Sequence, residues 1–119
     1  CVDVSGVDYP KQFSGCVIQP LEGVSLQPAF QKQSLQRADA LYFEHHLNCA
    51  IRDGKWKLVR KGNTGKHTVD AWELYNMETD RTELTNLAQQ QPLKVRELAV
   101  KWEAWAQRAR VKPWPWKVN

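Results

Sequence analysis

The feature that most constrains the fold is Asp53-Gly54, which lies between two runs of alternating apolar and polar residues. Asp-Gly in this setting predicts an antiparallel β-hairpin with a two-residue turn, both of whose central residues have positive φ. The predicted register sets Arg52 opposite Lys55, Ile51 opposite Trp56, Ala50 opposite Lys57 and Cys49 opposite Leu58. Opposed residues share a face, so one face is apolar and the other is basic. The apolar face holds Cys49, Ile51, Trp56 and Leu58, and the basic face holds Arg52, Lys55 and Lys57.

Two further runs predict strands that extend this hairpin into a sheet. Ala40–His46 alternates and is rich in aromatic residues, and Trp72–Met77 follows a polar loop at Gly62–Ala71. The sequence therefore predicts a small antiparallel sheet of about four strands, with one face in contact with water.

A long helix is predicted from Pro92 onward, because proline suits the first turn of a helix. Its apolar residues recur at steps of three and four: Val95, Leu98, Trp102, Trp105 and Ala109. Pro113 and Pro115 prevent the tail from continuing the helix. A stripe with two tryptophans should cover the apolar face of the sheet, so the predicted fold class is α+β.

The beginning of the chain has a different character. Gly6 follows Val2–Ser5 in the position of a left-handed helix cap, which predicts the end of a helix. A short helix is expected around Ser25–Phe30, and the rest of this Gly-, Pro- and Gln-rich stretch is expected to be extended. We therefore divide the chain into an extended segment at residues 1–36 and an α+β domain at residues 37–119.

Composition limits the possible functions only loosely. The chain has 119 residues and a net charge of +4, which is a weak preference for anionic partners. It has no apolar run long enough to span a bilayer and no signature of a nucleic-acid-binding fold, so neither partner is expected. Cys1, Cys16 and Cys49 are too widely spaced to predict a disulfide framework or a zinc site.

The candidate binding residues each have a plain structural alternative. His45 and His46 are neighbours on a strand and should point to opposite faces, which disfavours a shared metal ion. The basic residues are either a solvated face or a site for phosphate or sulfate groups: Lys55, Lys57, Arg60, Lys61, Lys66 and His67. Trp56, Trp102 and Trp105 are expected in the core, whereas Trp72, Trp114 and Trp116 are available for an interface.

Catalysis by a side-chain nucleophile needs an activating neighbour. The sequence has no Gly-x-Ser-x-Gly elbow, no cysteine near a histidine in a supporting motif, and no carboxylate cluster of metal-site type. The chain alone is therefore predicted not to be a complete catalyst, and no catalytic or metal-binding residue is assigned to it.

Two motifs carry a resemblance to a known family. The run "EHHLNCAIRDGKWKLVRK" and the later "WELYNMETDRTELTNLA", followed by a Trp-bearing helix, resemble the C-terminal subdomain of bacterial arylsulfatases. The typical family runs are close to "EHEGNRAIRDGKWKLV" and "WELYDMEADRTELNNLA". The upstream "CVDVSGVDYP" and "IQPLEGVSLQPAF" resemble the stretch that joins the catalytic domain of that family to this subdomain.

The resemblance implies a part of a sulfuric ester hydrolase that is inactive alone, packs on a catalytic domain of the same protein and helps wall the cleft for a sulfate-ester substrate. That catalytic domain would supply a formylglycine, made in a Cys/Ser-x-Pro-x-Arg motif, and a calcium-type metal. None of the three cysteines here begins such a motif. Relatives of this kind are commonly exported, which implies the periplasm or the extracellular space.

The resemblance also assigns residues. Glu44, His45 and Asn48 match the hairpin motif of the family and are the expected substrate-binding residues, with His45 nearest the cleft. Lys55, Lys57 and Lys61 are candidate anion contacts. Leu47 stands where the family usually has Gly, and Cys49 where it usually has Arg, so an expected guanidinium is missing.

Two rival functions remain open from the residues alone. One is a stand-alone module that binds sulfated glycans or other polyanions through Lys55, Lys57, Lys61 and Lys66, and whose binding would weaken steeply with salt. The other is a purely structural domain with an apolar face made for a partner, which a large exposed apolar patch would favour.

Overall fold

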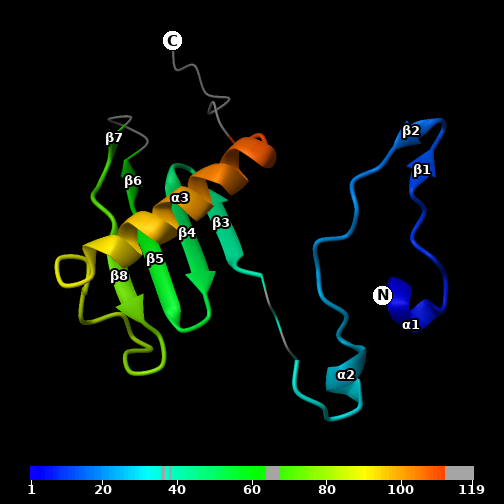
Figure 1. Ribbon diagram of the computed structural model, residues 1–119, viewed down its shortest axis with the longest axis horizontal. Helices are drawn as coiled ribbons and strands as arrows, with labels where there is room; N and C mark the ends of the chain where they lie inside the picture. Colours follow the sequence, from blue (N-terminus) through cyan, green and yellow to red (C-terminus); the bar gives the residue numbers. More distant parts are fainter. Residues whose placement is uncertain (36, 38, 64–67, 112–119) are drawn as a thin grey trace. The chain divides into compact units, whose positions relative to one another are not determined.

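The computed structural model describes residues 1–35, 37, 39–63 and 68–111. The expectations that concern Lys66, His67 and the tail with Trp114 and Trp116 lie outside these residues. The chain forms two compact units, Cys1–Ala38 and Asp39–Asn119, which are described separately (Figure 1).

The N-terminal unit contains two short helices and one small hairpin. Helix α1 spans Val2–Ser5 and helix α2 spans Gln27–Phe30, and Gly6 caps α1 with a φ of 69°, as predicted. Strands β1 (Gln12–Phe13) and β2 (Cys16–Val17) pair antiparallel, a hairpin that the sequence analysis did not predict. Its turn at Ser14 and Gly15 has positive φ at both residues.

The C-terminal unit is built on a four-stranded antiparallel sheet, as predicted, in the order β3-β4-β5-β8. The strands are β3 (Leu41–His45), β4 (Asn48–Asp53), β5 (Trp56–Arg60) and β8 (Glu73–Asn76). Helix α3, Pro92–Arg108, crosses one face of this sheet (Figure 1). The α+β prediction is therefore confirmed.

The predicted hairpin register is wrong by two residues. Asp53 pairs with Trp56, Ile51 with Leu58 and Cys49 with Arg60, so Gly54 and Lys55 are the turn residues. Of these two only Gly54 has positive φ, at 55°, which suits a turn with glycine at its first central position. The Asp53 carboxylate stays on the helix side, where it accepts a hydrogen bond from Lys101 at 2.7 Å. A shift of two residues keeps every side chain on its predicted face.

The core lies between this sheet and α3. Its buried members are Cys49, Ile51, Leu58, Leu74, Leu98, Trp102 and Ala106. Trp56 and Trp105 pack against it, as predicted. Trp72 does so too and meets Trp102 edge to face at 6.1 Å, so its predicted availability for an interface is wrong. The predicted stripe was also wrong at its end, because α3 stops at Arg108 and the exposed Ala109 is its cap.

Both edges of the sheet receive hydrogen bonds from outside it. At the β3 edge, the indole N–H of Trp102 donates to the carbonyl of Phe43 at 3.0 Å. At the β8 edge, the Leu74 N–H donates to the Asn86 side chain, and the Leu87 N–H donates to the Leu74 carbonyl. These bonds satisfy backbone groups that an open edge would present to other chains.

The predicted polar loop at Gly62–Ala71 contains a small ribbon instead. Strands β6 (Gly62–Asn63) and β7 (Thr68–Val69) pair antiparallel. Gly62 lies against Leu47, since a Cβ placed on this glycine would be 2.2 Å from the Leu47 Cβ. Gly62 therefore allows the β6 backbone to touch the β3–β4 turn.

The described residues contain neither a membrane-spanning helix nor a disulfide bond. Within the described residues, none of the helices has both the length and the apolar character needed to cross a membrane. The cysteines, all in the described part of the chain, form no disulfide, and Cys49 is buried whereas Cys1 and Cys16 are exposed.

Candidate functional site

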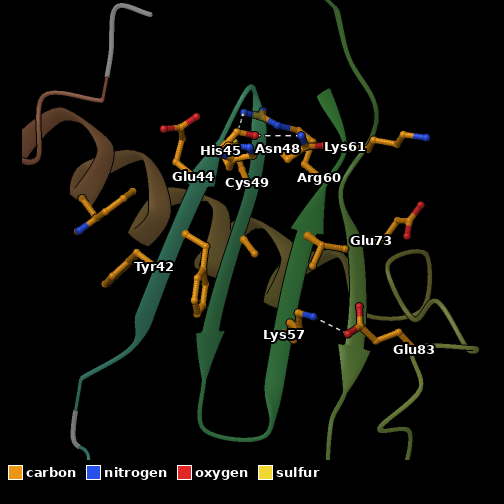
Figure 2. A pocket seen from close by; sticks show the side chains of 14 residues that line it. Tyr42, Glu44, His45, Asn48, Cys49, Lys57, Arg60, Lys61, Glu73 and Glu83 are labelled. Carbon is orange, nitrogen blue, oxygen red and sulfur yellow. Dashed lines mark hydrogen bonds and ion pairs between the residues drawn. The ribbon is translucent and has the colours of Figure 1, made fainter. Parts of the chain in front are cut away.

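A groove of about 700 Å³ runs over the face of the sheet that α3 leaves uncovered and around the β3 edge (Figure 2). Its floor is a row across all four strands, because Phe43 pairs with Ala50, Ala50 with Val59, and Val59 with Glu73. Phe43 is 51% exposed, so the groove offers an aromatic ring to solvent. Other residues that line it are Glu44, His45, Asn48, Lys57, Arg60 and Lys61.

Charges at the β8 side of the groove are paired within the domain. Lys57 forms an ion pair with Glu83, which reaches back from the segment after β8 (Figure 2). The Tyr75 hydroxyl donates to the Glu73 carboxylate at 2.5 Å. This hydrogen bond, with burial, raises the pKa of Tyr75 to about 12. The groove floor therefore combines apolar side chains with one ion pair and with a carboxylate that accepts a hydrogen bond from a tyrosine.

The β3–β4 turn lies at the other end of the groove. His46 and Leu47 are its central residues, with φ of 49° and 70°, and His45 pairs with Asn48 across it. Leucine seldom adopts positive φ, but here its side chain is only 8% exposed and is held against Gly62. The positive φ also explains why a glycine would suit position 47.

The turn changes the predicted relation of the two histidines. Because His46 leaves the strand for the turn, its ring meets the His45 ring at 4.3 Å, at an angle of 65°. The expectation that the rings point to opposite faces is therefore wrong. Within the part of the chain that the structure describes, no three His, Cys, Asp or Glu side chains are grouped so as to hold a metal ion.

Asn48 holds this turn in shape. Its side-chain NH₂ donates to the carbonyls of His45 at 2.9 Å and His46 at 3.3 Å. Its side-chain oxygen accepts from the Gly62 N–H at 3.1 Å. The amide thus uses both of its donors on the turn and ties the turn to β6, so its role in the geometry is to position the two imidazoles.

Cys49 and Arg60 form a second arrangement at this end of the sheet. They are opposed in the register of β4 and β5, and the guanidinium Nη2 lies 3.6 Å from the Cys49 sulfur. The Arg60 guanidinium also lies 4.5 Å from the Trp72 ring centroid and 5.7 Å from that of Trp102. The resemblance expects an arginine at position 49. In this chain a guanidinium lies beside that position, but it belongs to Arg60 on the neighbouring strand.

The structure gathers some of the predicted site residues and separates others. Glu44, His45 and Asn48 all line the groove at its turn end, together with Lys61. Lys55 instead occupies the β4–β5 turn, at the opposite end of β5 from Lys61, and Lys57 is paired with Glu83. The three candidate anion contacts thus do not form one cluster.

Sequence reasoning considered Arg60 as an anion contact but did not place it beside Cys49, and it did not place His46 and Leu47 in a turn. The dipeptide His46-Leu47 has none of the Asn, Asp or Gly residues that mark a two-residue turn, so no local signal was available. Arg60 could have been placed opposite Cys49 only with the correct hairpin register.

Comparison with known proteins gives a fold but no family. No known family pattern and no curated protein sequence matches the chain. Among solved structures, that of BT4656 in complex with its substrate D-glucosamine-2-N,6-O-disulfate matches with a TM-score of 0.62. The match covers 94% of this chain at 24% identity and spans 23% of the BT4656 chain. The chain therefore has the fold of about a quarter of a protein whose substrate is a disulfated sugar.

Proposed function

We propose that this chain is the C-terminal subdomain of a sulfuric ester hydrolase of the arylsulfatase type, inactive alone. The observation that carries the proposal is the fold shared with part of BT4656, whose substrate is a disulfated sugar. The hairpin and "LYNMETDRTEL" motifs, which resemble those of arylsulfatases, support it.

In this proposal the catalytic domain belongs to the same polypeptide and supplies the formylglycine and the calcium ion. This chain packs on that domain and walls part of the substrate cleft. The apolar residues exposed in the N-terminal unit, such as Phe13 and Phe30, would be covered there. The protein would act in the periplasm or outside the cell.

The substrate side of the subdomain would be the β3–β4 turn. His45 lines the groove and is exposed, and its ring is oriented by the His46 ring and the Asn48 clamp. A protonated or neutral imidazole at this position can donate a hydrogen bond to a sulfate or hydroxyl oxygen. Glu44, next along β3, would accept from sugar hydroxyl groups.

The test is sulfate release from 4-methylumbelliferyl sulfate and from D-glucosamine-2-N,6-O-disulfate, with calcium. The purified chain should release none above a heat-treated control, whereas the polypeptide extended by its preceding coding segment should release sulfate. In that longer protein, His45→Ala should raise KM more than it lowers kcat, and Arg52→Gln, on an exposed strand residue, should change neither. Turnover by the short chain, or an extended protein without a Cys/Ser-x-Pro-x-Arg motif, would refute the proposal.

A further inference from the structure

The Arg60 guanidinium is held in place by rings rather than by a carboxylate. Arg60 follows Leu58 by two residues on β5 and so faces α3, where its guanidinium lies beside the Trp72 and Trp102 rings. A cation at 4.5 Å and 5.7 Å from two indole centroids is attracted by both ring faces. The side chain is half-buried and lines the groove at the end where the β3–β4 turn lies.

The charge of Arg60 is not neutralised within the described residues. The lysines with ion pairs there, Lys57, Lys94 and Lys101, each contact a carboxylate, but Arg60 contacts none. Its Nη2 has only the weak acceptor Cys49 Sγ at 3.6 Å, and its Nε is buried without an acceptor. A half-buried guanidinium without a carboxylate partner is costly, and an anion at its exposed end would reduce that cost.

We propose that Arg60 is the anchor of a binding site for a tetrahedral oxyanion, such as a sulfate group, at the turn end of the groove. A guanidinium presents two parallel N–H donors that fit two oxygens of such an anion. The Trp72 and Trp102 rings hold the guanidinium plane before the anion arrives, so little side-chain entropy is lost on binding.

The turn provides additional contacts for the same anion. His45 lies across the turn from Asn48, and Lys61 follows Arg60. Both His45 and Lys61 line the groove, whereas the amide donors of Asn48 are used on the turn. The site stands on the contacts of this chain alone, so it does not depend on the proposed hydrolase function.

The experiment follows the Nε–Hε resonance of Arg60 in a ¹H–¹⁵N spectrum of the full chain, titrated with sodium sulfate at constant ionic strength. We expect a saturating shift for Arg60, and no such shift for Arg52, which is exposed on the other face of the sheet. Trp fluorescence should change over the same concentrations, since Trp72 and Trp102 contact the guanidinium. Sodium chloride and sodium acetate are the comparison anions.

The matched variants are Arg60→Lys and Arg52→Gln. Arg60→Lys should weaken sulfate binding by about tenfold because a lysine lacks the paired donors, and Arg52→Gln should leave it unchanged. The site would be refuted by equal shifts with chloride and sulfate, by a stronger response to acetate than to sulfate, or by an unchanged affinity in Arg60→Lys. The wild-type titration decides the matter even if a variant does not fold.

Discussion

The two units of this chain use apolar residues in opposite ways. In the N-terminal unit no described residue is buried, and Phe13, Val17 and Phe30 are each more than two-thirds exposed, at 73%, 80% and 69%. In the C-terminal unit, Ile51, Leu58, Leu74 and Trp102 are fully buried. Burial of apolar surface is the main source of stability, so the C-terminal unit should determine the unfolding transition of the chain.

The largest expected effect is at the centre of the C-terminal core. Trp102→Ala removes a fully buried indole and its hydrogen bond to Phe43, and should lower the free energy of unfolding by about 3–5 kcal/mol. The matched change in the N-terminal unit, Phe13→Ala, should alter it by less than about 0.5 kcal/mol. Urea unfolding followed by circular dichroism measures both, and a comparable loss in Phe13→Ala would remove the distinction between the units.

The next effect compares two glycines. Gly62→Ala would place its Cβ 2.2 Å from the Leu47 Cβ and 2.6 Å from the Leu47 carbonyl carbon. Because backbone is involved, relief requires the turn to move, and we expect a loss of about 2–3 kcal/mol. Gly23→Ala in the N-terminal unit meets no atom within 4 Å and should be neutral. Thermal melts of the two variants, side by side, test the contact between Leu47 and β6.

A third comparison uses alkaline pH. The pKa of Tyr75 is raised to about 12, so the folded state keeps a proton that the unfolded state loses from about pH 10 upward. Its contribution is complete below pH 10 and is lost as the pH rises through 12, by up to about 3 kcal/mol. Tyr75→Phe should flatten this part of the stability profile, and the matched Tyr9→Phe should not. An unchanged profile in Tyr75→Phe would contradict this role of Tyr75.

The smallest effect is expected at acid pH. The Asp80 carboxylate accepts hydrogen bonds from the N–H groups of Thr85, at 2.8 Å, and Leu84, at 3.1 Å, which lower the pKa of Asp80. Its contribution is therefore present above the pKa of an unfolded aspartate and is lost as the pH falls through the folded pKa. Asp80→Asn should lower the free energy of unfolding at pH 7 but not at a pH below the folded pKa of Asp80. Asp8→Asn, in the N-terminal unit, should leave the free energy of unfolding unchanged at both pH values.

The anion site at Arg60 and the proposed hydrolase function can be tested separately. Loss of sulfate binding in Arg60→Lys, with an unfolding transition like that of the wild type, would separate the anion site from the core on which it rests. A chain that binds sulfate but shows no hydrolase activity when extended would retain the Arg60 site and refute the proposed function.

The sequence by itself determined which residues face the core. The alternation in β4 and β5 and the three- and four-residue steps after Pro92 placed Ile51, Leu58, Leu98 and Trp102 correctly, because the side-chain period of a strand or helix is a local property of the backbone. That period survives a hairpin register that is wrong by two residues, so the α+β class and the covering helix were predictable. The glycine cap at Gly6 and a turn containing Gly54 were also predictable, because the tolerance of glycine for positive φ is local too.

Only the tertiary structure decided how the site is assembled. The positive φ of Leu47 is maintained by its burial against Gly62. Arg60 lies beside Trp72, the residue before β8, and beside Trp102 of α3. The pairing of Lys57 with Glu83 likewise joins residues that are far apart in the chain. Contacts of this kind depend on the exact register and on the path of distant segments, whereas local propensity favours glycine at a position like Leu47 and solvent for a residue like Arg60.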